Sequence, residues 1–388
     1  MRLMYFTYHK LLKNWRIKTF AASTLQMLGA RHIVLRLDIT SACNLKCKMC
    51  YLSGANQTKT VRFSPEQITR IAEQLFSKTK LIYLSCGFEP FMSKNFELAL
   101  SLVRKYKVPY SVAVTNGQLL NREKIEMICR LQLSELIVSL DSPVEKTYNS
   151  IRSTGKEENE EGGQKKRTTG FNVLIKNLKE LNEYKRKNAL EKPALRFNVT
   201  LMRENIEELP DLINFASEMG VNVVHARHMD YFPEAIIDFG AQTLFNHAEL
   251  ANAKLEEARS LAKQKGMFLD APAPIPSKFT DEVLRKSDYK FACPYPWFQV
   301  MVRMDGTVAP CTHWTEESLG NVFEDNFEEI WKNNFGELRR NVLKGKIPSS
   351  CVSCSINGGA KDIQKIFHKK WENTANDVGY EYDKRHGL

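Results

Sequence analysis

The sequence predicts an α/β protein in which parallel strands bend into an incomplete barrel, followed by a smaller unit. Short apolar runs alternate with helical stretches from residue 34 to about residue 228, which is typical of consecutive βαβ units. Within the runs, apolar side chains alternate with polar ones. A closed eight-stranded barrel fills its interior with branched apolar side chains. Polar interior positions therefore indicate a wider or incomplete barrel that holds a polar ligand at the C-terminal ends of its strands.

Six strands are expected in this region, with helices between them. The strands are expected at residues 34–40, 81–85, 110–115, 136–141, 194–201 and 221–227. The helices are expected at residues 64–76, 95–106, 170–187 and 205–218. Because successive strand residues point to opposite sides of a sheet, Leu35 and Leu37 share one face and Arg36 takes the other. The fifth and sixth strands place polar residues on the same interior side: Arg196, Asn198, His225 and Arg227.

The rest of the chain divides into segments of different character. Residues 1–37 contain seven Lys or Arg and no Asp or Glu, interleaved with apolar residues. Such a segment either covers an edge or the bottom of the barrel, which we favour, or lies on an anionic membrane surface. The expected divisions are a basic amphipathic segment at 1–33, the barrel at 34–235, a helical connector at 236–290, an auxiliary unit at 291–360 and a C-terminal tail at 361–388.

The composition indicates where in the cell the protein is expected and which partners it is expected to have. No apolar run reaches the roughly 20 residues needed to span a bilayer, and no secretory signal is recognisable. A cytoplasmic protein is expected, with peripheral membrane contact through residues 1–33 as an alternative. The net charge is +11, but no RNA-binding motif accompanies it, so no nucleic-acid partner is expected. Most of the nine cysteines fall into two groups, which in a reducing compartment indicates metal binding and not disulfides.

The first cysteine group follows the first expected strand directly. Cys43, Cys47 and Cys50 have the spacing C-x3-C-x2-C. Three thiolates from one loop can ligate three irons of a cubane cluster and leave the fourth iron open to a small molecule. Zinc is the competing metal, although a structural zinc site usually has four ligands in paired C-x2-C knuckles.

With this loop the chain resembles the radical S-adenosylmethionine (SAM) superfamily over about residues 34–228. The resemblance implies a partial (β/α)6 TIM-like barrel, a [4Fe–4S] cluster on the three cysteines and SAM chelated by the open iron. It also implies reductive cleavage of SAM to a 5′-deoxyadenosyl radical, which removes a hydrogen atom from the substrate. A flavodoxin- or ferredoxin-type protein would supply the electron.

Other landmarks of that family follow in order along the chain. Gly87-Phe88-Glu89-Pro90 stands where the family has a Gly-Gly-Glu-Pro turn that meets the methionine amino group, with Phe88 in place of the second glycine. Arg152 resembles the arginine that pairs with the SAM carboxylate. Met49 stands where an aromatic residue near the adenine is usual. The resemblance also implies contacts with the methionine or ribose part of SAM for Asn116, Ser139 and Asp141.

A second cysteine group lies near the end of the sequence. A hairpin around Asp305-Gly306 is expected to bring Cys293 and Cys311 together. A following helix would deliver Cys351 and Cys354. Four converging thiolates can bind zinc or an iron–sulfur cluster. The unit resembles the auxiliary-cluster domains known as SPASM and twitch, and its four cysteines make the twitch form, with a second auxiliary [4Fe–4S] cluster, the closer match.

Resemblance to twitch-bearing enzymes favours an oxidation. A fully ligated auxiliary cluster cannot bind substrate without losing a ligand, so it is expected to accept an electron from the substrate radical. The expected substrate is small and hydroxylated or sugar-like, and a nucleotide or a lipid-linked sugar would suit the basic N-terminal segment. His225 would take the hydroxyl proton, with Arg227 beside it for an anionic group.

Three alternatives stay open. One is a peptide-modifying maturase, although the segment before residue 34 is too small for the usual leader-binding domain. A second is a redox-neutral epimerase, for which Cys86 could donate a hydrogen atom. Its parity with Ile82 and Leu84 points Cys86 away from the polar interior, however, so Cys86, like Cys129, is expected to be a core residue. The third is a zinc-stabilised binding protein, for which the ordered SAM landmarks would be a coincidence.

Overall fold

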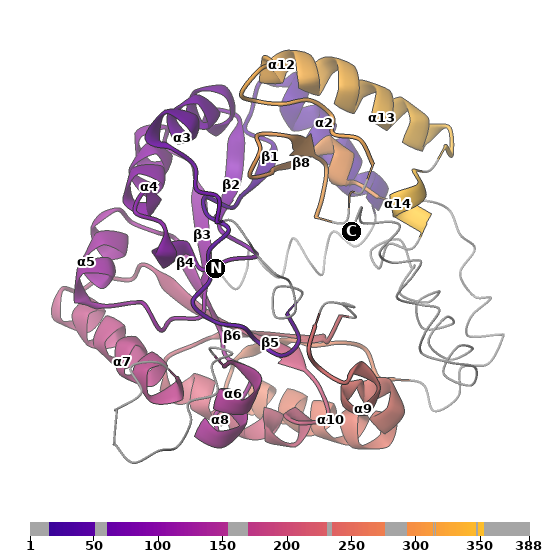
Figure 1. Ribbon diagram of the computed structural model, residues 1–388. Helices are drawn as coiled ribbons and strands as arrows, with labels where there is room; N and C mark the ends of the chain where they lie inside the picture. Colours follow the sequence, from indigo (N-terminus) through magenta and orange to yellow (C-terminus); the bar gives the residue numbers. More distant parts are fainter. Residues whose placement is uncertain are drawn as a thin grey trace.

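The centre of the molecule is one nine-stranded sheet in the order β7-β6-β5-β4-β3-β2-β1-β8-β9 (Figure 1). Neighbours from β7 to β8 are parallel, and β9 runs antiparallel to β8. The strands are β1 (Ile33–Leu37), β2 (Thr79–Leu84), β3 (Tyr110–Thr115), β4 (Glu135–Ser139), β5 (Ala194–Leu201), β6 (Val223–His228), β7 (Phe268–Asp270), β8 (Gln299–Val302) and β9 (Val308–Ala309). This computed structural model describes residues 15–50, 60–153, 170–230, 235–275, 293–312, 314, 316–346 and 348–352.

Helices follow the parallel strands and lie on the outside of the sheet (Figure 1). Ser64 begins the first of them with a capping box, because its hydroxyl accepts the Gln67 N–H while the Gln67 side chain accepts the Ser64 N–H. Asn121 caps α5 in a similar way through the Lys124 N–H. The outer helices are α3 (Pro65–Ile71), its π-helical continuation η2 (Ala72–Phe76), α4 (Phe96–Lys105), α5 (Arg122–Arg130), α6 (Glu145–Ile151), α7 (Phe171–Lys187), α8 (Leu209–Glu218) and α10 (Ala248–Gln264).

Burial confirms the alternation expected in the strands. Leu35 and Leu37 are fully buried in the hydrophobic core that the outer helices share with the sheet. On the other face, the Arg36 guanidinium lies 4.7 Å from the centre of the Tyr83 ring. Deeper in the barrel, Arg196 Nε lies 3.1 Å from Glu135 Oε1. The inner face of the barrel is therefore polar. The predicted α/β class with an incomplete barrel is confirmed.

A seventh parallel strand lies in the segment given above as a helical connector at 236–290. There α10 is followed by β7, which pairs with β6 through His225 and Asp270. A strand of three residues leaves too short a pattern to be read from sequence. The barrel sheet consequently extends to residue 270, beyond the expected boundary at residue 235.

The auxiliary unit continues the barrel sheet at its other edge. The expected hairpin forms from β8 and β9, and β8 pairs in parallel with β1. Gly306 occupies the turn at φ +85°, and the Asp305 carboxylate accepts the Thr307 N–H. The segments that follow are α12 (Phe327–Glu329), η7 (Ile330–Asn334), α13 (Phe335–Leu343) and α14 (Ser349–Val352).

The described part of the basic N-terminal segment is the helix α2 (Trp15–Met27), which lies beside the auxiliary unit (Figure 1). Its Ala22 packs in one cluster with Trp297 and Phe298. No helix among the described residues is long and apolar enough to cross a membrane. Residues 1–14 of the basic segment, Cys354 and the expected tail at 361–388 lie outside the described residues.

Candidate functional site

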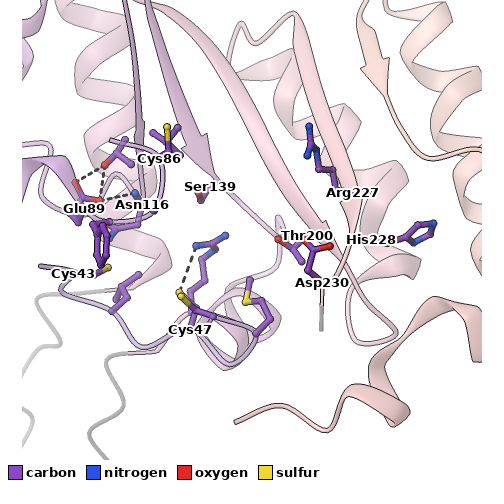
Figure 2. Close-up of a pocket in the computed structure, with 18 residues that line it drawn as sticks. Cys43, Cys47, Cys86, Glu89, Asn116, Ser139, Thr200, Arg227, His228 and Asp230 are labelled. Carbon is purple, nitrogen blue, oxygen red and sulfur yellow. Dashed lines mark hydrogen bonds between the residues drawn. The ribbon is translucent and has the colours of Figure 1, made fainter. Parts of the chain in front are cut away.

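A cavity of about 310 Å³ opens at the C-terminal ends of the barrel strands (Figure 2). This is the end of the sheet at which the sequence predicts the ligand. Its walls come from the loop after β1 and from the ends of β2 to β6. The lining residues include Cys43, Cys47, Met49, Cys50, Cys86, Gly87, Phe88, Glu89, Asn116, Ser139, Arg152, Thr200, Arg227, His228 and Asp230.

The three predicted cysteines all line this cavity. Cys47 is buried, Cys43 and Cys50 are partly exposed, and the Cys50 N–H donates to the Cys47 carbonyl at 2.9 Å. The Lys48 N–H donates to the Ile151 carbonyl at 3.0 Å, which ties the loop to the end of α6. Burial raises the pKa of the Cys47 thiol to about 12 and also raises that of Cys43. Thiolates at these positions therefore need a nearby cation.

The donor set fits an iron–sulfur cluster. No group of three His, Cys, Asp or Glu side chains among the described residues is placed to hold a single metal ion. In a cubane, however, each thiolate binds a different iron, so three thiols need not converge on one point. Three thiols on the wall of one cavity meet that weaker requirement.

Arg152 supplies a positive charge beside the cysteine loop. Its Nη1 lies 3.6 Å from Cys47 Sγ, and its Nε lies 2.7 Å from Asp141 Oδ2. The other Asp141 oxygen accepts the Thr200 N–H at 2.7 Å. Arg152 and Ser139 line the cavity, but Asp141 does not. The structure thus places Asp141 behind Arg152, where it holds the guanidinium, and not on the wall where the sequence predicts a SAM contact.

The turn after β2 presents a buried carboxylate. Glu89 accepts hydrogen bonds from Thr115 Oγ1 at 2.8 Å and from the Asn116 N–H at 2.8 Å. Asn116 in turn donates to Asn44 of the cysteine loop at 2.8 Å. Gly87 and Phe88 line the cavity with Glu89, whereas Pro90 is buried at the start of a 3-10 turn. Burial outweighs these donors and raises the pKa of Glu89 to about 7.

Glu89 is expected to make the stability of the cluster-free protein depend on pH. Its pKa is about 7 in the folded protein against an ordinary value of 4.5, so the folded state binds more protons between these values. The stabilisation is complete below pH 4.5 and is lost as the pH rises through 7. In denaturant unfolding, Glu89→Gln should therefore gain stability relative to the unmodified protein from pH 4.5 to 7. A constant difference across this window would contradict the raised pKa.

The two residues proposed as catalytic from sequence contact each other but take different positions relative to the cavity. Arg227 lines the cavity, but His225 does not. His225 Nδ1 lies 2.8 Å from Asp270 Oδ2, and its Nε2 accepts from Arg227 Nε. Burial lowers the pKa of His225, which favours the neutral ring. His225 is therefore placed to orient Arg227, and the geometry does not offer it to a substrate hydroxyl as a base.

Several cavity residues are not singled out by the sequence pattern. His228 is the last residue of β6, and Asp230 follows the strand. Both therefore line the cavity from positions that the alternation of side chains along the strand does not predict. Burial lowers the pKa of His228 to about 4, and its ring lies 5.0 Å from that of Phe245. Their position directly after a predicted parallel strand is the signal that could have found them.

Cys86 corrects an expectation. The parity of β2 points it into the core, yet Cys86 lines the cavity. The cause is Ser85, whose φ of +91° ends the strand's alternation one residue earlier. By contrast, Cys129 lies buried in α5 within the main core, as expected.

Three auxiliary cysteines lie within the described residues. Cys311 and Cys351 pack against the cluster that contains Trp297 and Phe298. Cys293 is buried. Burial raises the pKa of Tyr295, and Cys293 and Cys311 raise it further electrostatically, so both thiols lie near that ring. Cys354, the expected fourth ligand, lies outside the described residues.

Two family models match the chain. The radical SAM superfamily model matches residues 37–216, and the SPASM model, an iron–sulfur cluster-binding domain, matches residues 293–355. The chain contains a radical SAM domain followed by a SPASM-type domain. Its cofactors are accordingly SAM, the [4Fe–4S] cluster of the SAM site and auxiliary iron–sulfur cluster content. The family prediction is confirmed, and the narrower twitch form stays a prediction.

Among curated proteins, the chain is similar to the antilisterial bacteriocin subtilosin biosynthesis protein AlbA of Bacillus subtilis, with 24% identity over 83% of this chain and 66% of AlbA. It is 23% identical to the tungsten-containing aldehyde ferredoxin oxidoreductase cofactor-modifying protein of Pyrococcus furiosus, over 87% of this chain and 92% of that protein. It is 22% identical to the PqqA peptide cyclase of Gluconobacter oxydans, over 82% of each.

Among solved structures, Streptococcus suis SuiB bound to its precursor peptide SuiA has a TM-score of 0.59 to this chain. The match has 16% identity and covers 82% of this chain and 69% of SuiB. At this identity the likeness is one of fold.

Proposed function

We propose that this radical SAM enzyme modifies a peptide. The observation that carries the radical SAM part is the shared cavity of three loop thiols, the Glu89 carboxylate and the Arg152 guanidinium. The peptide part rests on relatives that align with most of the chain, one named for bacteriocin biosynthesis and one for a peptide. The expected dehydrogenation of a small sugar-like compound has no counterpart among these relatives.

The roles of the cavity residues follow from their chemistry. Cys43, Cys47 and Cys50 would ligate the cluster, since their loop supplies three thiols to one wall. Arg152 is placed to compensate thiolate charge at Cys47 and to pair with a carboxylate in the cavity. When bound, the cluster and SAM supply a one-electron SAM cleavage whose radical product removes a hydrogen atom from the substrate.

Glu89 would meet an ammonium group such as that of methionine. A carboxylate whose pKa is about 7 is ionised by a neighbouring cation, because an opposite charge favours the charged form. Its hydrogen bonds to Thr115 and Asn116 fix its two oxygens in the wall of the cavity. The carboxylate is therefore oriented before any ligand binds.

Peptide modification is tested by mass spectrometry. The anaerobically reconstituted enzyme, SAM and a flavodoxin-type donor are incubated with each short peptide encoded beside the gene, and the products are examined for mass change, new cross-links and inverted residues. One peptide is expected to change, and to remain unchanged with a variant that lacks Cys43, Cys47 and Cys50. If no peptide changes while a small-molecule extract increases 5′-deoxyadenosine formation, the enzyme acts on a small molecule, and the function of the Pyrococcus relative becomes the better guide.

A further inference from the structure

One thiol in the cavity is not needed for the SAM cluster. Among the described residues, Cys86 is the cavity-lining cysteine outside the C-x3-C-x2-C loop. Figure 2 draws it at the end of β2, on the same cavity as Cys47 and Arg227. A thiol that ligates iron has lost its proton. Cys86 is not one of the three loop thiols assigned to the cluster. It is the cavity thiol that can keep an S–H bond while the cluster is bound.

The backbone holds Cys86 in this place. The N–H groups of Cys86 and Gly87 both donate to Asp38 Oδ1, at 2.6 and 3.2 Å. Ser85, at φ +91°, donates its hydroxyl to the Phe88 carbonyl at 2.6 Å. A residue other than glycine rarely adopts this φ, and here it turns the next side chain from the core into the cavity. Several contacts thus fix the backbone at Cys86 and the direction in which its side chain leaves the chain.

A partly buried arginine flanks the sulfur. Arg36 Nη1 donates to Cys86 Sγ at 3.6 Å, and Arg36 Nε donates to Gln299 Oε1 at 3.4 Å. Gln299 in turn donates to the Pro310 carbonyl at 3.1 Å, next to Cys311. Burial nevertheless raises the pKa of Cys86 to about 12, so the sulfur carries its hydrogen at neutral pH.

We infer that Cys86 donates a hydrogen atom to a carbon radical formed in this cavity. The S–H bond breaks and a C–H bond forms, which leaves a sulfur radical on Cys86 and a closed-shell product. One electron from the same external flavodoxin- or ferredoxin-type donor and one solvent proton then restore the S–H bond. The substrate loses one hydrogen atom to SAM-derived adenosine and regains one from Cys86, so the product is an isomer of the substrate.

This inference rests on the proposed function and narrows it to one redox-neutral reaction. That reaction is the inversion of a peptide residue at its Cα. Inversion requires that the hydrogen return to the opposite face of the carbon, which a donor separate from the adenosine can achieve. Without a substrate, the 5′-deoxyadenosyl radical itself can take the hydrogen from Cys86. That side reaction allows a test that does not need the peptide.

The experiment is SAM cleavage in D2O without peptide, in a thiol-free buffer with dithionite as the electron donor. The S–H of Cys86 exchanges with solvent, so the 5′-deoxyadenosine is expected to carry deuterium. The 5′-deoxyadenosine formed by Cys86→Ala or Cys86→Ser is expected to lack deuterium. The control variant Cys129→Ala, which changes a buried cysteine of α5, is expected to keep it. Iron content of each variant is measured first, so that a variant without its cluster is recognised.

A spin trap with peptide mapping provides an independent readout on the unmodified protein. The trap is expected on Cys86, and an adduct only at another residue overturns the inference. Deuterium that persists in both Cys86 variants overturns it as well. If the Cys86 variants lose the label but the enzyme oxidises its peptide, the proposed enzyme class stands and the redox-neutral role is rejected. If no peptide is modified at all, the proposed function fails, but the labelling result for Cys86 is unaffected.

Discussion

With Cys43, Cys47 and Cys50 all replaced by alanine, the anaerobically reconstituted protein is expected to hold about four irons per chain where the unmodified protein holds about eight. It should form no 5′-deoxyadenosine. The physical reason is that all three thiols line one cavity from one loop, so their removal leaves that loop without a thiolate donor.

The matched control removes the auxiliary thiols. Replacing Cys293, Cys311 and Cys351 by alanine should lower the iron by a similar amount while the SAM-site cluster stays. About four irons with one zinc in the unmodified protein would assign zinc to the auxiliary cysteines and remove the electron-acceptor role expected from sequence. No iron after careful reconstitution would contradict the cluster site itself.

Asp141→Ala is expected to cause the largest loss of stability. It leaves the Arg152 guanidinium buried without its carboxylate, since Asp141 has a fully buried side chain and Arg152 is only 11% exposed. Breaking such a pair from one side costs about 3–5 kcal/mol, because a buried charge is left uncompensated. Denaturant unfolding of the cluster-loaded protein measures this cost, with iron content checked alongside.

Two further variants make the result specific. Glu126→Ala breaks the exposed pair with Arg122, whose Nε lies 2.6 Å from Glu126 Oε1, and should cost much less than Asp141→Ala, because water screens an exposed pair. The double variant Asp141→Ala with Arg152→Met removes both buried charges and should recover part of the loss. If Asp141→Ala lowers the free energy of unfolding no more than Glu126→Ala does, the buried pair does not stabilise the fold.

Local pattern was sufficient for most of the barrel and for the cysteine loop. Alternation over successive residues depends only on strand geometry, so the polar interior around Arg36 and Arg196 could be predicted. The spacing of Cys43, Cys47 and Cys50 on one loop likewise needs no long-range information. The turn at Glu89 and the arginine at position 152 were found by resemblance, and both line the predicted cavity.

Long-range pairing decided what the pattern could not. The pairing of β8 with β1 joins positions 34 and 299, and no local signal specifies which edge a hairpin selects. The His225 and Asp270 contact required β7, a strand too short to recognise. Of the two residues proposed together from sequence, Arg227 lines the cavity and His225 pairs with Asp270.

By itself the sequence determined the class of the protein: parallel strands with a polar interior, a three-thiol loop at their C-terminal ends and a second cysteine unit behind a hairpin. These features follow from period and spacing, which neighbouring residues encode directly. Only the tertiary structure decided that Asp141 stands behind Arg152 and that Cys86 faces the cavity. The side of Cys86 depends on the backbone angle of Ser85, and the place of Asp141 depends on its contacts with Thr200 and Arg152. Such angles and contacts are selected by the packing of the whole fold.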